Sequence, residues 1–234
     1  VGEDRAKLLV YLVATSRKLG RPLSLAVVSR SSGGKSHMVL KVTELMPEED
    51  HFGYSRVSGK ALFHDEENRL KHKVLTVEEA EGMEEATYAL RVMQSAQVLR
   101  TLSTITDPTT GRHKAQENVV RGPVALVVTT TQDLDFETVS RAFVVSVDES
   151  EEQTQRIHQM QRQSRTLAGL GAKMRQEAIT KRHQNAQRLI QGLAVVNPYA
   201  LQLTFPTGTL RLRREHDKYL TLIEAITLLH QFQR

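Results

Sequence analysis

The sequence predicts an α/β fold in which a parallel β-sheet is followed by a helical carboxyl-terminal part. Short apolar runs rich in β-branched residues alternate with stretches of helical spacing up to about residue 148. The four runs expected to be strands lie at 23–29, 74–77, 124–131 and 142–147. Because strands separated by helices pair in parallel and are covered on both faces, these runs indicate one parallel sheet.

Helical patterns fill much of the remaining chain. An acidic, helix-prone stretch begins at Glu78 and continues to about Arg100. After residue 148 no β-prone run interrupts the helical patterns, which lie at about 149–165, 172–193 and 214–234. We therefore expect two domains, a sheet domain over 1–150 and a helical, basic domain over 151–234.

Composition narrows the class of protein. With 39% hydrophobic and 25% charged residues, the chain is typical of a globular protein, and the absence of cysteine excludes disulfides and thiolate zinc sites. No apolar run approaches the ~20 residues needed to span a bilayer, so we expect a cytoplasmic protein with no membrane partner. Residues 151–234 carry 13 Lys and Arg against 6 acids, which indicates either a face that meets a polyanion or a solvated basic surface.

A glycine-containing segment between the first strand and the following helix has the pattern of a phosphate-binding loop. Residues 29–36, SRSSGGKS, match G-x-x-x-x-G-K-[ST] except that Ser29 replaces the first glycine. In such a loop Lys35 neutralises the β- and γ-phosphate oxygens, and the Ser36 hydroxyl reaches Mg²⁺. The residues expected to bind the nucleotide are Ser31, Ser32, Gly33, Gly34, Lys35, Ser36 and His37.

Two adjacent acids end the second strand, VLTVEE. A phosphate-loop ATPase needs an acid near the metal and often a glutamate that activates the attacking water. We expect Glu78 on the metal side and Glu79 as general base, although the sequence alone leaves their division of labour open. Acids in the first turn of a helix, favoured by its dipole, are the competing interpretation.

Single polar residues complete the expected ATPase site. Thr130 or Thr131, at the end of the third apolar run, could hydrogen-bond the lytic water. Arg141, just before the fourth run, could reach the nucleotide of a neighbouring subunit, and a surface arginine is the alternative. Of Arg213 and Arg214, near the start of the last helix, one could contact the γ-phosphate.

A β-hairpin is predicted over residues 104–122, where the PTTG turn signal has β-prone flanks. Arg112, His113 and Lys114 would lie near its tip, where cations could grip a DNA backbone. An ordinary exposed hairpin is the alternative interpretation.

Several of these segments together resemble the ATPase region of bacterial zinc-finger (CHC2-type) DNA primase and helicase proteins of mobile elements. They include PLSLAVVSRSSGGKS, SGKALFHDEENRLKHKVLTVEEAEG, VRGPVALVVTTT, SRAFVVSVDESEEQT and RREHDKYLTLIEAITLLHQFQR, and the resemblance covers almost the whole chain. That ATPase region is similar to AAA+ helicases of the MCM-like group. The resemblance implies a P-loop AAA+ core followed by a helical lid domain.

The resemblance also implies roles for individual residues. It makes residues 29–36 the Walker A loop, Glu78 and Glu79 the Walker B acids, Thr130 the sensor 1 residue, Arg141 the arginine finger and Arg214 the sensor 2 residue. The implied activity is an ATP- and Mg²⁺-dependent motor on single-stranded or forked DNA, assembled as a homo-oligomeric ring, expected to be a hexamer, with other replication domains or proteins. A nucleotide-gated DNA-binding or loading adaptor with little turnover is the alternative, and primer synthesis is disfavoured because no further acidic triad is present.

Overall fold

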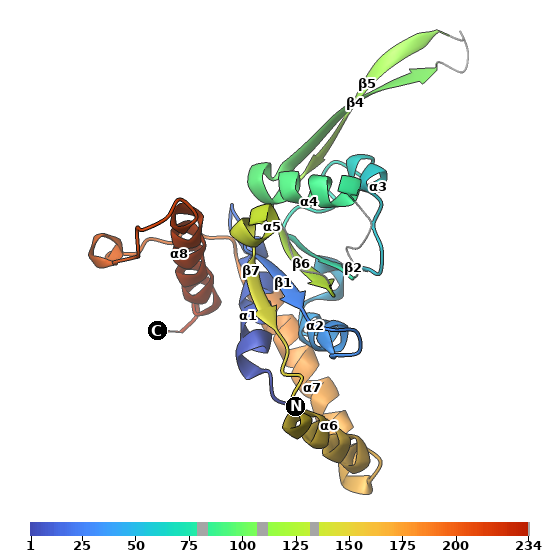
Figure 1. The fold of residues 1–234 in the computed structure, drawn as a ribbon, viewed down its shortest axis with the longest axis vertical. Coiled ribbons are helices and arrows are strands. Elements are labelled where there is room, and N and C mark those ends of the chain that lie inside the picture. The colour runs from blue at the N-terminus through green and yellow to red at the C-terminus, as the bar shows by residue number, and fades with distance from the viewer. Residues whose placement is uncertain (79–83, 107–111, 132–135, 234) are drawn as a thin grey trace.

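Five parallel strands form the central sheet of the chain (Figure 1). The computed structural model describes residues 1–78, 84–106, 112–131 and 136–233. The strands lie in the order β2-β3-β6-β1-β7, and every neighbouring pair is parallel. Their bounds are β1 (Ser24–Val28), β2 (His51–Tyr54), β3 (Lys73–Val77), β6 (Val124–Thr130) and β7 (Phe143–Ser146). The four strands predicted from the apolar runs are present, and β2 is added at one edge.

Helices cover both faces of this sheet. One core cluster joins β1 and β6 to α1 (Asp4–Thr15), α2 (Lys35–Thr43) and α8 (Leu212–Leu229). A second cluster joins β3 and β6 to α3 (Gly59–Phe63) and α4 (Glu84–Ala96) on the other face. The central strand β6 contributes Ala125 and Val127 to the first cluster and Val124 and Leu126 to the second. A strand buried on both faces accounts for its uninterrupted apolar run.

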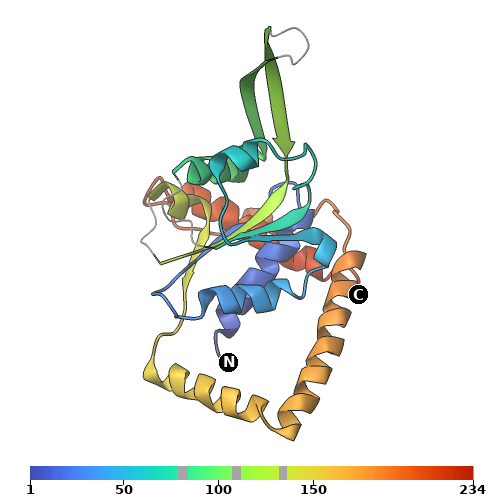
Figure 2. The same cartoon turned by 90° about the vertical axis from the view of Figure 1, so that its right-hand side faces the viewer.

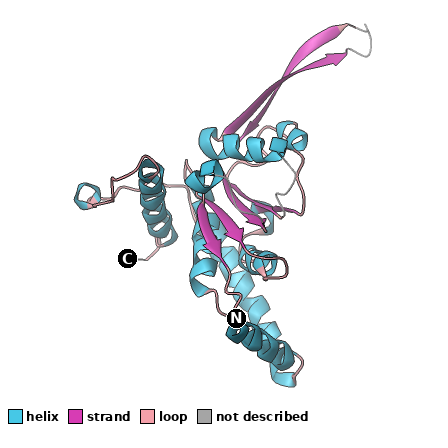
Figure 3. Cartoon of the chain, in the orientation of Figure 1, coloured by secondary structure: helices cyan, strands magenta, loops and turns pink. Residues whose placement is uncertain are grey.

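A long antiparallel hairpin projects from the body, as Figures 1 and 3 show. It consists of β4 (Val98–Thr106) and β5 (His113–Arg121), and its register runs from Val98 opposite Arg121 to Thr106 opposite His113. The predicted hairpin is present but begins six residues earlier than expected, because Leu99 and Val120 are buried in the second core cluster and anchor its base. The helix predicted to end at about Arg100 therefore ends at Ala96.

The carboxyl-terminal part is helical. After α5 (Phe136–Arg141) and β7, the helices α6 (Glu151–Ser164) and α7 (Leu167–Leu189) extend below the body and return to it (Figure 2). Residues 190–211, with the short helix η3 (Ala200–Gln202), lead to α8. Ile190, Ala225 and Leu228 belong to the core cluster of β1, so this part shares the core of the sheet. Among the described helices, none has the length and apolar character needed to cross a bilayer.

A buried charged cluster fastens α7 to the body. Arg17, in the short helix η1 (Ser16–Lys18), is fully buried and donates to Asp50 Oδ2 at 3.0 Å and to Gln187 Oε1 at 2.8 Å. Asp50 ends the short helix η2 (Glu48–Asp50) and also accepts from Lys73 Nζ at 2.9 Å. The cluster therefore connects η1, η2, the sheet and α7 through side chains that are mostly shielded from water.

Candidate nucleotide-binding site

The loop between β1 and α2 has the backbone of a tight glycine turn. Gly34, which immediately precedes α2, has a φ of 88°, a conformation in which only glycine is unstrained. A Cβ at Gly33 would lie 2.5 Å from the Ser29 hydroxyl oxygen, so the serine that replaces the usual first glycine occupies the space beside Gly33. The loop thus reaches the N-terminus of α2, where unpaired backbone N–H groups can bind an anion.

Lys35 lies across this loop with its ammonium group weakly held. Its side chain is buried, and Nζ donates to the Arg30 carbonyl oxygen at 3.4 Å, which is long for a hydrogen bond. The Arg30 backbone N–H in turn donates to Glu149 Oε1 at 2.8 Å, which ties the loop to the segment before α6. The lysine can therefore exchange a weak neutral partner for a phosphate oxygen with little loss.

The remaining predicted loop residues are open to solvent or nearly so. Ser31, Ser32 and His37 are exposed, and Ser36 is half-buried in the first turn of α2. Such exposure leaves these side chains accessible to a ligand bound over the loop.

A cavity of about 150 Å³ lies between α2 and the strands β2, β3 and β6. Ser36 lines it from α2, and Glu78 lines it from the end of β3, so the structure brings together the two residues predicted to hold Mg²⁺. The Glu78 backbone N–H donates to the Tyr54 carbonyl oxygen at 2.9 Å, which fixes the end of β3 beside β2. Glu79, the predicted general base, lies outside the described residues.

Thr129, which the sequence did not single out, also lines this cavity. Its side chain is 2% exposed, and its hydroxyl has no hydrogen-bond partner within the described ranges. Side chains alternate along β6, so Thr129 faces α2 as Ala125 and Val127 do. Thr130 follows Val128 and faces the α4 side, while its carbonyl oxygen accepts from the Ser29 N–H at 3.3 Å.

His51 is a second cavity residue that sequence reasoning missed. Its Nε2 lies 2.9 Å from the Thr76 hydroxyl, and burial lowers the pKa of the imidazole. A neutral histidine therefore forms one wall of the cavity at physiological pH. No local motif surrounds His51, so only the pairing of β2 with β3 could reveal its place.

The oxygen groups at this cavity fit a magnesium ion with its nucleotide. Mg²⁺ prefers hard oxygen ligands and is commonly held by one or two protein groups together with phosphates and water. The Ser36 hydroxyl and the Glu78 carboxylate supply such ligands, and the unpartnered Thr129 hydroxyl can bond a water or phosphate oxygen beside them. The groups present therefore match the chemistry that the phosphate loop requires.

The two arginines assigned to the nucleotide do not lie at this chain's own loop. Arg141 precedes β7, whose Phe143 pairs with Leu25 at the start of β1, whereas the phosphate loop follows the other end of β1. Arg141 donates to the Ser95 hydroxyl at 2.8 Å and is paired with Glu137. Arg214 comes from α8 and donates to the Ser140 hydroxyl at 2.6 Å. Both arginines therefore gather at α5.

The predicted DNA-binding cations lie at the outer end of the hairpin. Arg112, His113 and Lys114 are exposed, and His113 Nδ1 lies 3.3 Å from the Thr106 hydroxyl. In Figure 1 the hairpin end and α2 lie far apart. A ligand on the hairpin would therefore leave the cavity beside Ser36 uncovered.

Comparison with known families agrees with this geometry. A family model described as the MTBMA_p00010 P-loop domain matches residues 1–181, which include the loop, Glu78 and Thr129. Among curated proteins, no match was found. The matched region covers most of the chain and contains the complete parallel sheet. The chain belongs to the MTBMA_p00010 P-loop domain family.

Proposed function

We propose that the chain is an ATPase that binds ATP and Mg²⁺ at residues 31–37 and uses hydrolysis to act on DNA. The observation that carries this proposal is the cavity at which Ser36, Glu78 and the unpartnered Thr129 hydroxyl meet. An unsatisfied buried hydroxyl costs about 1–3 kcal/mol, so a bound water or phosphate oxygen at this position would remove that cost.

The proposed chemistry combines these groups with Glu79, the general base expected from the sequence. Backbone N–H groups at the start of α2 and the Lys35 ammonium group bind the phosphates and hold the γ-phosphorus in place. The ion held by Ser36 and Glu78 neutralises phosphate oxygens when it is bound. Thr129 orients a water whose oxygen attacks the γ-phosphorus, and the Glu79 carboxylate accepts the proton while ADP leaves with the electrons of the broken P–O bond.

The proposal also includes binding to DNA and assembly into a ring. The exposed hairpin cations Arg112, His113 and Lys114 support a contact with a single-stranded or forked DNA backbone. Arg141 lies away from its own chain's loop, which supports a role at the nucleotide of a neighbouring subunit in a ring, expected to be a hexamer. In that role Arg141 must exchange Glu137 for a phosphate oxygen. Arg214, held on Ser140 beside it, would act at the same subunit boundary.

Steady-state ATP hydrolysis by purified variants tests the assignment. Lys35→Ala is expected to lower turnover at least about 100-fold, because the transition state loses a charge that contacts its oxygens. Lys41→Ala is the matched control: Lys41 is in the same helix, is exposed and pairs with Glu44 at 2.8 Å. Equal turnover in the two variants would place catalysis elsewhere.

Addition of DNA separates the motor from the adaptor. If the chain is a motor, forked DNA stimulates hydrolysis several-fold, whereas an adaptor hydrolyses ATP slowly whether DNA is present or not. A wild-type protein that hydrolyses ATP but ignores DNA at every length and salt concentration would refute the DNA part of the proposal alone.

A further inference from the structure

The helical pair α6 and α7 carries an unusual concentration of unpaired positive charge. Between residues 153 and 187 there are seven Lys and Arg and one acid, Glu177. The seven cations are Arg156, Arg162, Arg165, Lys173, Arg175, Lys181 and Arg182, and all are exposed. Within the described part of the chain none of them forms an ion pair, unlike Arg188 at the end of α7, which binds Glu49 at 2.7 Å. Their charges are therefore available to a ligand.

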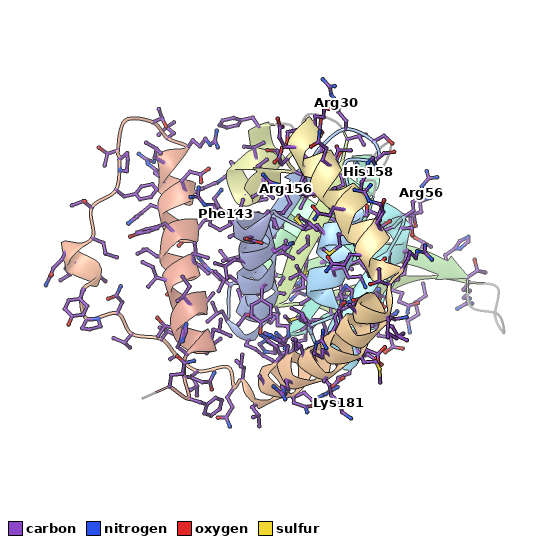
Figure 4. The ribbon with its side chains drawn as sticks, turned by 90° about the horizontal axis from the view of Figure 1, so that it is seen from below. Arg30, Arg56, Phe143, Arg156, His158 and Lys181 are labelled. Atoms are coloured by element: carbon purple, nitrogen blue, oxygen red, sulfur yellow. The ribbon has the colours of Figure 1, made fainter. Side chains whose placement is uncertain are left out.

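These cations lie on helices that stand clear of the sheet. Figure 2 shows α6 below the body and α7 rising along one side of it, and Figure 4 shows Arg156 and His158 on α6 and Lys181 on α7 across the face seen from below. Of the residues of α6, only Gln153 is buried. The helix α7 faces the body across a cavity that Lys173 and Lys181 line opposite α2, and only Gln187 of α7 is buried. Most of the surface of the pair therefore contributes little to the core.

We propose that α6 and α7 bind the phosphate backbone of double-stranded DNA without regard to its sequence. A duplex carries one negative charge per ~1.7 Å of axis when both strands are counted, so a length equal to that of α6, about 21 Å at ~1.5 Å per residue, holds on the order of twelve phosphate charges, of which those on the near side can be contacted. Arg and Lys neutralise such charges, and the many glutamines of the pair, including Gln155, Gln159 and Gln163, donate hydrogen bonds to phosphate oxygens.

The composition of the pair favours a duplex over a single strand. Proteins that bind single strands stack exposed bases on aromatic side chains. Residues 151–189 contain no Phe, Tyr or Trp, so no stacking platform is present on these helices. Contacts would be limited to the backbone, which a duplex presents continuously.

An anionic membrane surface is the competing partner, and α6 disfavours it. A helix that lies in a membrane interface needs a continuous apolar face, whereas α6 contains only two large apolar residues, Ile157 and Met160. On α7, Leu167, Leu170 and Met174 form a short exposed apolar stripe. Since α6 has no such stripe, a membrane interface would hold only part of the pair. Membrane binding is therefore an outcome for the test to exclude.

This inference rests on the proposed action on DNA, but its site differs from the hairpin. The hairpin end lies at the opposite end of the molecule from α6 and α7 (Figure 1). A duplex held by the helical pair and a single strand held by the hairpin would let one chain contact both arms of a fork.

Duplex binding by the full chain, measured by fluorescence anisotropy over a range of salt concentrations, tests the site. The variants Arg156→Gln/Arg162→Gln and Arg175→Gln/Arg182→Gln each remove two cations and keep good helix formers. The matched control Arg21→Gln/Lys71→Gln removes two exposed cations far from this pair in sequence. Each helical variant is expected to raise Kd on the order of tenfold and to lower the slope of log K against log salt by about 2, while the control stays near wild type.

The outcomes separate this inference from the proposed function. If the wild-type protein binds a duplex and the helical and control variants lose affinity equally, the assignment of the DNA site to α6 and α7 is wrong, but the proposed ATPase activity is unaffected. If the helical variants lose duplex binding but the wild-type protein has no ATPase activity, the DNA site is supported and the proposed motor function is refuted. Binding to phosphatidylserine vesicles but not to a duplex would replace DNA with a membrane, and so would overturn the inference. Normal secondary structure by circular dichroism, required of every variant, shows that lost binding is not lost folding.

Discussion

At the scale of single residues, Thr129 carries the most specific information in the structure. Its hydroxyl is buried beside Ser36 and Glu78 with no partner among the described residues, although nearly all buried polar groups in proteins are hydrogen-bonded. A strand residue tolerates such a cost when the group serves a ligand. The neighbouring Thr130, to which the family resemblance gave the sensor role, faces the other side of the sheet and contacts the loop through its carbonyl oxygen.

Replacing each threonine by valine, which keeps its shape, distinguishes their roles. Thr129→Val is expected to lower ATP turnover about tenfold or more, since the lytic water loses a partner, and to leave stability unchanged or raised, since no buried group remains unsatisfied. Thr130→Val is expected to keep most of the turnover. Steady-state hydrolysis and thermal unfolding measure both effects. Turnover lost only in Thr130→Val would return the sensor role to Thr130.

The sequence could predict Ser36 and Glu78 but not Thr129, for a physical reason. Lys35 and Ser36 follow a strand in a motif whose spacing is set by the phosphate, and acids at the end of a parallel strand reach the same edge of the sheet. The run VALVVTTT is buried on both faces, so no alternation of apolar and polar residues shows which threonine faces α2. Only the order of the strands in the sheet shows which threonine faces α2.

At the scale of elements, the buried Asp50 cluster fixes α7 and hence the basic helical pair. Burial by itself raises the pKa of the Asp50 carboxyl group, but hydrogen bonds from Lys73 and Arg17 outweigh this and lower the pKa from 3.8 to about 2. Because the pKa is lower in the folded state, the stabilisation is complete above the unfolded value of 3.8 and is lost as pH falls through about 2.

Asp50→Asn should therefore destabilise the chain and remove part of its acid sensitivity. Leaving Arg17 buried without its partner is expected to lower the free energy of unfolding at pH 7 by about 3–5 kcal/mol. Glu117→Gln, which breaks the exposed pair with Arg100, should cost less than about 1 kcal/mol. Urea unfolding at pH 7 and between pH 4 and 2 measures both. Equal losses in the two variants would contradict the role of the cluster.

Element boundaries show where sequence reasoning was limited. The hairpin was predicted from its turn signal, but Val98 to Arg100, which begin β4, were assigned to a helix because Ala, Met, Glu and Leu precede them, and residues 101–103 were assigned to neither element. Their strand conformation depends on Leu99 packing under α4 with Val120, a contact between distant residues. The bounds of α6 were predicted to within two residues, whereas α7 begins five and ends four residues earlier than expected. Both are long exposed helices that depend on local propensity and on capping by Ser150 and Thr166.

At the scale of the whole molecule, the three regions to which we assign functions lie apart from one another. The phosphate loop and cavity lie at the carboxyl ends of β1, β3 and β6, the hairpin projects from one end of the body, and α6 and α7 extend at the other (Figure 1). Arg141 and Arg214 meet at α5, away from the loop of their own chain. This separation agrees with the proposed subunit, which would hold nucleotide at a boundary with its neighbour and DNA at its ends.

The parallel sheet was predictable because alternating strands and helices restrict the topology strongly. The position of α8 could not be predicted from the sequence. Its amphipathic pattern shows that one face is buried but does not identify the partner, and the structure shows Ala225 and Leu228 packed into the core cluster that includes α1 and β1. The direction of Arg214 follows from that packing.

Magnesium-dependent binding of a fluorescent ATP analogue tests the central claim most directly, namely that the loop ahead of Lys35 holds a nucleotide whose metal lies between Ser36 and Glu78. We expect saturable binding that weakens at least about tenfold in Glu78→Gln with Mg²⁺ and is equal in wild type and Glu78→Gln when EDTA removes the ion. No binding by wild-type protein at millimolar analogue, or no change in Glu78→Gln, would contradict the account.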